Sequence, residues 1–498
     1  MAREPISNVD TVWLRVEDPT NLMMINGVLV FGAPLDFERL KETLEAGLLR
    51  FRRFRQRVVR PGGAMGRLAW EDDPAFDMDN HLKRIELAPP GDQAVLQDLS
   101  SELSSTQLDM SRPLWQFHLI ESYGQGSALI CRLHHAMGDG VALVQVLLAM
   151  TSVDPDGPPL YALQGEPPSP VRPRAPRFFP RTRRLIRGTR RAAGMICREG
   201  MKVIADPWRA VELARSGAGE AKAAAILVLR WPDPKTVLKG KLGMTKRVAW
   251  SQPLALADVK AVGRALGGTV NDVLLSAMAG GLRRYLQGRN QPVDDLSIRA
   301  IVPVNMRQPG TELELGNRFS LVFLSLPVDM ADPAQRLGEL RRRMDGLKGS
   351  YEAPAAWGIL NAMGISPKRI QDIAVDLFGT KGTAVMTNVM GPGRKLYLVG
   401  APLEGLMFWV PQSGRLGLGV SILSYDDRVW LGVMTDRGLV PDPEAILAGF
   451  GEEYEALLDL ARKTPARLSA KEMLAMLDGA LATLDSFAEE KKGAGRSS

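Results

Sequence analysis

Short apolar runs and helically spaced apolar residues alternate along most of the chain. The runs "INGVLVFG", "WQFHLIES" and "SALICRLHH" have the length of strands, and the two glycines of "YGQG" between the last two suit a hairpin turn. Residues 37–49 and the stretch "DGVALVQVLLAMTS" instead place apolar residues at the spacing of a helix. This pattern predicts a mixed α/β unit in the N-terminal part of the chain.

A similar alternation resumes beyond residue 205. Residues 270–286 and the stretch "PAQRLGELRRRMDGLK" predict helices, whereas "LSIRAIVPVNM", "NRFSLVFLSLPV" and "TAVMTNVMGP" predict buried strands. The two halves share the order of their elements, although no residue-level repeat relates them. We therefore predict an α/β (α+β) protein with an N-terminal lobe over 1–160 and a C-terminal lobe over 205–465.

The segment between these lobes, residues 161–204, predicts a linker followed by a basic helix. Its first part, "PPSPVRPRAPRFFPRTRR", is too rich in proline for a packed element. Over residues 183–202 the basic side chains share one side of a helical wheel, and Leu185 and Ile186 lie on the other side. Such a helix suits an anionic membrane or lipid-droplet surface. It equally suits a solvated helix whose apolar face packs on the parent domain.

The net charge of +7 is concentrated in this segment. Residues 172–202 contain eleven Arg and Lys residues against one acidic residue, Glu199, so their balance is +10 and the rest of the chain carries −3. Because the basicity is local, we expect no general nucleic-acid-binding surface.

Length and cysteine content narrow the class of protein further. The 498 residues exceed what one hydrophobic core usually spans. Cys131 and Cys197 are too few for a disulfide framework, which favours a reducing compartment. The N-terminus has no apolar core of signal-peptide length, and no run of about eighteen apolar residues occurs. We therefore expect a soluble or peripheral protein.

The C-terminal residues 466–498 predict an amphipathic tail. Within it, Met473, Leu477, Leu481 and Leu484 share one face of a helix, and we expect that face to dock. The closing "KKGAGRSS" predicts disorder.

The candidate chemistry lies in "HHAMGDG", where a predicted strand meets a predicted helix. His134 and His135 are two of only four histidines in the chain, and histidine is the side chain most easily poised as a base near neutral pH. Nucleophilic catalysis and metal binding would both need further residues that the sequence does not clearly supply. A nucleophile would need G-x-S-x-G, which is absent, and Cys131 predicts a buried apolar residue. A metal site would need further ligands, for which only His81, His118 and scattered carboxylates are available.

General-base catalysis fits the pair better. A neutral His135 would take the proton of an alcohol or amine while that group attacks an activated acyl carbon. Asp139 would orient the loop, through backbone amides or by pairing with an arginine, and Gly140 would permit a turn that a Cβ obstructs. The remaining use is structural, with both histidines capping a strand end, and we favour this interpretation for His134.

Several motifs resemble one enzyme family. The stretch 134–140 is similar to the HHxxxDG motif of acyl-CoA-dependent acyltransferases, which include chloramphenicol acetyltransferase and peptide-synthetase condensation domains. The stretches "RPLWQFHLIE", "TVNDVLL" and "TNVMGPG", with the opening "SNVDTVWLRVEDPTNLMMINGVLVF", narrow the resemblance to bacterial wax ester synthases/diacylglycerol acyltransferases. It covers roughly residues 5–460. Met390 departs from the family, which commonly has proline there.

The resemblance implies two chloramphenicol-acetyltransferase-like lobes joined by a crossover linker, with an active-site tunnel between them. It implies that His135 takes the hydroxyl proton of diacylglycerol or a long-chain alcohol while the oxygen attacks the thioester of acyl-CoA. Asp139 would be structural, with Arg299 or Arg307 as its partner. Acyl-CoA is then a co-substrate, and we expect no cofactor and no metal.

The other motif residues would bind substrate or support the site. Asn271 is a candidate for stabilising the developing oxyanion, and equally a candidate helix N-cap. Trp115 would line the acyl channel or support the site from beneath. Asn388 and Gly391 would shape a substrate-binding loop where the halves meet.

A lipid substrate also suggests a location. An enzyme that makes neutral lipid must collect its substrate from a bilayer, and the basic helix over 183–202 could supply the attachment. We therefore expect a cytoplasmic protein, peripherally associated with the inner face of the membrane or with lipid inclusions.

Three other functions stay open at this stage. A stand-alone condensation domain uses the same motif, although it would normally sit beside a carrier domain. The spacing of His134 and Asp139 also occurs in glycerol-phosphate acyltransferases, whose glutamate–glycine block has no convincing counterpart here. A lipid-binding protein could keep the fold without turnover.

Overall fold

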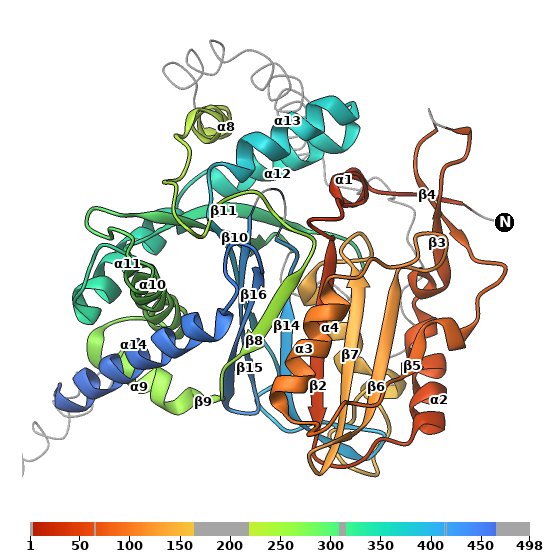
Figure 1. Cartoon of the computed structure of the whole chain (residues 1–498). Coiled ribbons are helices and arrows are strands. Elements are labelled where there is room, and N and C mark those ends of the chain that lie inside the picture. The colour runs from red at the N-terminus through yellow and green to blue at the C-terminus, as the bar shows by residue number, and fades with distance from the viewer. Residues whose placement is uncertain are drawn as a thin grey trace, which may run out of the picture.

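The structure is a computed structural model of the whole chain (Figure 1). It describes residues 3–63, 66–163, 219–307, 315–412, 414 and 416–464. The predicted basic helix and amphipathic tail lie outside these residues, as does nearly all of the predicted linker, so they stay predictions. None of the helices in the described ranges has the length and hydropathy that crossing a membrane requires.

Two large mixed sheets form the framework of the fold. The first has the strand order β13-β14-β2-β7-β6-β5, and the second has the order β11-β10-β12-β15-β16-β8, with β9 added on β16. A small sheet, β1-β4-β3, stands apart from them. The strands are β1 Glu4–Pro5, β2 Met24–Phe31, β3 Gln56–Val59, β4 Ala69–Asp72, β5 Leu82–Arg84, β6 Trp115–Tyr123, β7 Gly126–His134, β8 Lys246–Trp250, β9 Leu254–Ala255, β10 Ile298–Asn305, β11 Phe319–Leu326, β12 Ala384–Met390, β13 Tyr397–Leu398, β14 Ala401–Trp409, β15 Leu418–Tyr425 and β16 Arg428–Asp436.

Helices surround the sheets, with α9, α10, α11 and α14 gathered beside the second sheet and α8, α12 and α13 at its β11 side (Figure 1). The α-helices are α1 Asn8–Val16, α2 Phe37–Gly47, α3 Gln93–Ser104, α4 Gly140–Ala149, α5 Leu160–Leu163, α8 Gly219–Leu229, α9 Leu256–Leu266, α10 Val270–Gly288, α11 Pro333–Lys348, α12 Glu352–Ile365, α13 Lys368–Gly379 and α14 Pro443–Lys463. Short 3-10 helices occupy Leu48–Arg50, Arg52–Arg55 and Met78–Asn80.

The hairpin β6–β7 carries the double histidine and forms as the apolar pattern predicts. Gly124 has a φ of +59° at the turn, a conformation that favours glycine. All nine residues of β7 are buried, because β2 and β6 flank the strand and both of its faces are covered. Cys131 lies in this strand as a buried apolar residue, as predicted. The hairpin therefore gives the site a rigid base.

The C-terminal half contributes two strands to the sheet of the N-terminal half. Strands β13 and β14 belong to the C-terminal half but complete the first sheet, where β14 pairs antiparallel with β2 from Leu403–Phe31 to Trp409–Asn26. Helix α3 of the N-terminal half contacts β8 of the C-terminal half, and Val248 donates to the hydroxyl of Ser101 at 2.9 Å. The predicted lobes are thus interlocked, and the ranges 1–160 and 205–465 are not separable bodies.

Candidate active site

His134 and His135 end strand β7, and main-chain hydrogen bonds hold both of them. The amide of His134 donates to Leu114 O at 2.9 Å, and the amide of His135 donates to Met23 O at 2.7 Å. Successive residues of an extended chain point to opposite sides, so the two imidazoles enter different surroundings. Each ring has to be considered separately.

The ring of His134 is fully used in hydrogen bonds. Its Nδ1 accepts from the amide of Ala136 at 3.0 Å, so Nε2 carries the proton and donates to Glu17 Oε2 at 2.6 Å. Burial acts to raise the pKa of Glu17, but the hydrogen bonds from His134 and Gln107 hold it below its ordinary value. His134 does not line the cavity described next. The structural interpretation of His134 therefore agrees with its contacts, and the catalytic one does not.

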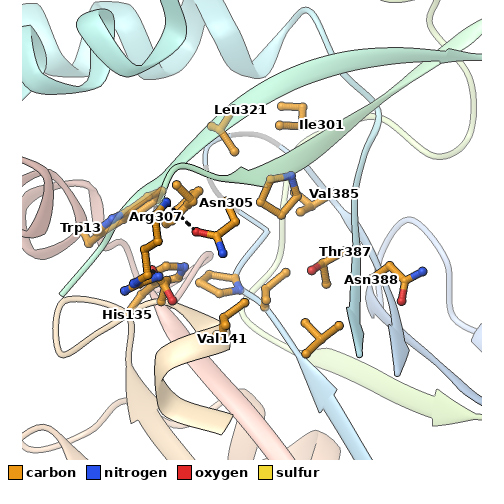
Figure 2. Close-up of a pocket in the computed structure, with 17 residues that line it drawn as sticks. Trp13, His135, Val141, Ile301, Asn305, Arg307, Leu321, Val385, Thr387 and Asn388 are labelled. Atoms are coloured by element: carbon orange, nitrogen blue, oxygen red, sulfur yellow. Dashed lines mark hydrogen bonds and ion pairs between the residues drawn. The ribbon is translucent and has the colours of Figure 1, made fainter. Parts of the chain in front are cut away.

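His135 lines a cavity of about 130 Å³ between the two large sheets (Figure 2). Trp13 of α1 stacks on its ring at a centroid distance of 4.6 Å, and Phe319 of β11 lies at 5.4 Å. Burial lowers the pKa of His135 to about 4. The imidazole is therefore neutral at pH 7, which is the state that a general base requires.

Asp139 joins the loop that follows β7, residues 135–139, to the C-terminal half. Its Oδ1 accepts from the amide of Ala142 at 3.0 Å and caps α4. Its Oδ2 forms a buried ion pair with Arg307 and accepts from the amide of Arg318 at 3.1 Å. Both orienting roles predicted for Asp139 are therefore present. Of the two predicted arginine partners, Arg307 is the correct one.

The second candidate arginine lies elsewhere. Arg299 pairs with Asp233 at 3.4 Å and donates to the carbonyl groups of Trp231 and Lys381. These contacts tie β10 to the segment after α8, away from Asp139.

Gly140 lines the cavity, but the conformational reason predicted for it is wrong. Its φ is not in the left-handed region, and a Cβ added there would meet only Val410 Cγ1, at 4.0 Å. The backbone turn would thus accept a side chain. A side chain at the start of α4 would instead occupy space in the cavity.

The opposite wall comes from β10, β11 and β12 and is mostly apolar. Ile301, Leu321 and Val385 contribute to it. Thr387 and Asn388 lie at the far end of the cavity from His135 (Figure 2). Asn388 therefore lines the cavity as predicted, but not beside the imidazole.

Asn271 and Gly391 do not reach the cavity wall. Asn271 accepts a hydrogen bond from Asn388 Nδ2 at 3.1 Å and is absent from the lining. It is not the N-cap either, since Thr269 caps α10 in a capping box with Asp272. Gly391 follows β12 and donates to Ser424 O at 2.7 Å, where a Cβ would crowd that carbonyl oxygen. Gly391 therefore shapes the chain, whereas its predicted substrate contact is not observed.

Trp115 supports the first sheet from within and does not line the cavity beside His135. It is 1% exposed, its Nε1 donates to Phe54 O at 2.9 Å, and its ring stacks on His81 at 4.5 Å. The predicted acyl-channel role is therefore wrong, and the supporting role is the one observed. In the described parts of the chain, no three His, Cys, Asp or Glu side chains are placed to hold a metal ion.

A second, smaller cavity of about 80 Å³ adjoins the first and is lined by apolar residues and glycines. The two cavities share Trp13, Ile301 and Leu321 as lining residues. Residues of α12 and α13, among them Ala356 and Ala374, complete the second cavity. Its composition suits an alkyl chain and offers nothing to a charged ligand.

Sequence analysis missed the contribution of α1. Trp13 stacks on His135, Glu17 binds His134, and Asp10 hydrogen-bonds Asn317, which contacts the His135 main chain. The spacing i, i+3, i+7 places these three residues on one face of a helix. An acid, an aromatic and an acid on an otherwise apolar face was the signal that could have found them.

Comparisons with known proteins place the chain in a family. A model of the wax ester synthase/diacylglycerol acyltransferase catalytic domain matches residues 6–274, and a model of the C-terminal domain of the same family matches residues 315–458. The probable diacylglycerol O-acyltransferase tgs2 of Mycobacterium tuberculosis is 30% identical over 449 residues, covering 88% of this chain and 95% of tgs2. The corresponding tgs1 is 27% identical, covering 92% and 96%.

Solved structures show the same fold. The wax ester synthase/diacylglycerol acyltransferase from Marinobacter aquaeolei VT8 is similar with a TM-score of 0.66 and 23% identity, covering 92% of this chain and 99% of that one. The first condensation domain of the calcium-dependent antibiotic synthetase follows with a TM-score of 0.58 and 17% identity, covering 94% and 97%. The predicted two-lobed acyltransferase fold is confirmed. This chain belongs to the wax ester synthase/diacylglycerol acyltransferase family.

Proposed function

We propose that this protein transfers a fatty acyl group from acyl-CoA to the hydroxyl group of diacylglycerol or of a long-chain alcohol. The observation that carries the proposal is the position of His135, a neutral imidazole at one end of a cavity whose opposite wall is apolar. Membership of the family supports the class of enzyme, an O-acyltransferase. Which acceptor dominates depends on how the cavity fits the two lipids.

The reaction needs one base and no covalent enzyme intermediate. His135 takes the acceptor's hydroxyl proton while the oxygen attacks the thioester carbon. The new C–O bond forms, the C–S bond breaks, and the imidazolium returns the proton to the departing CoA thiolate. Asp139 does not touch the substrates, and its contacts with α4 and Arg307 keep the loop in place.

Asn305 replaces Asn271 as the amide that could stabilise the oxyanion. Its Oδ1 accepts from the amide of Arg307 at 2.9 Å, so its Nδ2 is directed into the cavity on the side nearer His135 (Figure 2). An amide donor whose oxygen is already held by a hydrogen bond is suited to a developing negative charge at the cavity wall.

The apolar wall and the second cavity supply space for alkyl chains. An acyl chain that passes Trp13 reaches a cavity of about 80 Å³ under α12 and α13. Burying each methylene group there would contribute about 0.8 kcal/mol. This favours long-chain over short-chain substrates.

The direct test measures ester formation by the purified protein. Labelled acyl-CoA is supplied with diacylglycerol or hexadecanol, and wild type is compared with His135→Ala. Labelled ester from the wild type and strongly reduced ester from the variant support the proposal. Equal rates would remove His135 from the mechanism, and no product with either acceptor would favour a lipid-binding protein. Amide formation with an amine acceptor would favour the condensation alternative.

The lipid acceptor also requires contact with a membrane or lipid droplet. The basic segment 183–202 is the predicted attachment, and the described residues add an apolar one. Helix α8 and the residues after it expose Ile226 and Trp231, the latter 83% exposed, and α13 exposes Ile373. Exposed apolar residues, in a chain that also carries a basic segment in its sequence, suit an interface of anionic lipid.

Sedimentation with vesicles tests this attachment. We expect binding to phosphatidylglycerol vesicles, weaker binding to neutral phosphatidylcholine, and release at high salt. A Trp231→Ala variant should bind more weakly at every salt concentration. Equal, salt-independent binding to both vesicles would contradict the electrostatic part of the proposal.

A further inference from the structure

The two nitrogens of His135 have different surroundings. Nδ1 is buried and makes no hydrogen bond of regular geometry. Because the ring lines the cavity, Nε2 is the nitrogen left to meet a substrate. Nε2 can accept a proton only if Nδ1 carries the ring proton of the neutral imidazole. A buried N–H without a partner costs about 1–3 kcal/mol. The groups that act on the ring as hydrogen-bond partners, and so raise the pKa of His135 against the effect of burial, are its own main chain and the side chain of Asn317.

Asn317 is the polar side chain in contact with this residue. Its Nδ2 donates to the main-chain oxygen of His135 at 2.7 Å and to Asp10 Oδ1 at 2.7 Å. Its own Oδ1 is buried without a hydrogen-bond partner. His135 Nδ1 is thus a buried donor and Asn317 Oδ1 a buried acceptor, and a hydrogen bond already joins the two residues through the main-chain oxygen of His135. A small shift of either side chain would pair them.

Asp10 decides which way the Asn317 amide faces. An ionised carboxylate only accepts hydrogen bonds, so the NH₂ group of Asn317 must face Asp10 and the oxygen must face away. The main-chain amide of Asn317 also donates to Asp10 Oδ1, at 3.3 Å. Asp10 is itself buried on α1, one helical turn before Trp13, which stacks on the ring of His135.

We propose that Asn317, oriented by Asp10, is a positioning residue that holds His135 in the tautomer with the proton on Nδ1 and the lone pair on Nε2. The catalytic consequence rests on the proposed acyl transfer, whereas the tautomer itself can be observed without turnover. Asn317 touches no reacting atom and acts only through His135. The main-chain position, ring plane and tautomer of His135 are then all set by α1 and Asn317.

The charged groups around this arrangement bear on its pH dependence. Asp139 acts to raise the pKa of His135, and His134 acts to lower it, both after the larger effect of burial. The pKa of Asp10 is raised by burial, against the opposing effects of Ser7, Asn317 and Arg53. Because Asp139 and His134 stay intact in variants at residues 10 and 317, a change in the pH profile of such a variant reports the change at those two residues.

Asn317→Ala is the first variant. We expect kcat to fall by about 10- to 100-fold, the size of effect seen when an outer partner of a functional histidine is removed, with KM for both substrates nearly unchanged. Asn26→Ala is the matched control, because Asn26 is also a buried asparagine with an unpartnered Oδ1 but lies within β2. The control should lose stability without the same loss of kcat.

The double variant Asp10→Asn with Asn317→Asp separates positioning from packing. It keeps a hydrogen bond between the two residues but removes the donor to the His135 main chain. A carboxylate oxygen at position 317 can still accept a hydrogen bond from Nδ1–H, so we expect kcat to rise above that of Asn317→Ala and the acid limb of the pH profile to move upward. A kcat no higher than that of Asn317→Ala, with the acid limb of the profile unchanged, would show that residue 317 does not act on the His135 ring.

Nitrogen-15 NMR of labelled histidine reads the tautomer directly in the resting protein. The chain has only four histidines, and His135→Ala identifies the signal. We expect the Nδ1–H tautomer in wild type and a shift towards Nε2–H in Asn317→Ala. The same tautomer in both proteins would overturn the inference. An inactive wild type with the expected tautomers would instead count against the proposed function alone.

Discussion

The two walls of the cavity beside His135 differ in the residues that form them. The wall from the N-terminal half is dense with polar contacts, since its residues His135 and Asp139 are each held by residues from other elements. The wall from β10 to β12 is mostly apolar. Of its polar residues, Thr387 and Asn388 lie at the far end and Asn305 lies nearer His135 (Figure 2). In the proposed function, the first wall fixes the reacting groups and the second shapes the space for lipid.

This division yields a ranking of mutational effects. Changes in the polar wall should alter kcat or stability strongly, because each removes a partner from a buried group. Changes in the apolar wall should alter which lipid is preferred, because alkyl contacts are weak individually and additive.

The largest expected effect is at His135. His135→Ala removes the base, and kcat should fall by about 10³-fold, with the melting temperature little changed. His134→Gln is the companion variant, since it breaks the hydrogen bond to Glu17 but leaves His135 in place. It should lower the melting temperature more than His135→Ala and kcat less. Initial rates and thermal melts check both, and the reverse ranking would mean that the roles of the histidines are exchanged.

The next effect concerns the ion pair that joins the walls. The side chains of Arg307 and Asp139 are only 13% and 6% exposed. Asp139→Asn should therefore cost about 3 kcal/mol of unfolding free energy, measured by urea denaturation. Asp459→Asn removes a similar aspartate from an exposed pair with Arg462 and should cost at most about 0.5 kcal/mol. Equal costs would argue that the buried pair contributes nothing special.

A third comparison sets two amides against each other. Asn305→Ala should lower kcat by about 100-fold if its Nδ2 stabilises the oxyanion. Asn271→Ala should have a much smaller effect, because Asn271 contacts Asn388 and not the cavity. Steady-state rates of the two variants decide the matter, and a larger loss for Asn271→Ala would restore its original assignment.

The apolar wall is tested by filling the second cavity. Ala356→Leu adds three carbons at its edge, so rates with long acyl chains should fall by about tenfold relative to short ones. Competition between hexadecanoyl- and octanoyl-CoA measures this ratio directly. Rates with the shorter chain serve as the internal control. An unchanged ratio would mean that the acyl chain does not enter this cavity.

The smallest effect is in the pH profile. Because burial lowers the pKa of His135 from 6.5 to about 4, the free base persists in mild acid. The acid limb of kcat/KM should therefore lie well below pH 6, and the rate should be nearly constant between pH 6 and 7. A limb centred near pH 6.5 would refute the burial of the ring and place it in contact with solvent. Rates in overlapping buffers at constant ionic strength suffice.

Much of the fold and the central residue could be predicted from sequence. The strand period of β7 and the helical spacing of α4 meet at His134–Gly140, so the junction and its base follow from local pattern. The capping of α4 by Asp139 is local too. What the pattern cannot give is the partner across the fold: Arg307 lies 168 residues from Asp139, and Asn317 lies 182 residues from His135.

The errors have similar physical causes. Trp115 begins a strand whose alternate residues face opposite ways, and spacing alone does not say which side holds the cavity. For α10, the predicted start at residue 270 is correct, but Thr269 caps the helix in a capping box, so Asn271 lies inside the helix and not at its N-cap. Gly140 suggested a turn because glycine is frequent in turns, whereas in the structure its missing side chain leaves space in the cavity.

The pairing of β14 with β2 has a consequence for biosynthesis. During translation, β2, β7 and β6 leave the ribosome long before β14, which ends at Trp409. Until then, one margin of the nascent sheet presents unsatisfied main-chain groups and is open to mispairing. The loop of residues 135–139 is thus supported by the complete sheet only after β14 emerges, when more than four-fifths of these 498 residues have been synthesised. Expressing residues 1–163 alone should yield aggregates rather than half an enzyme.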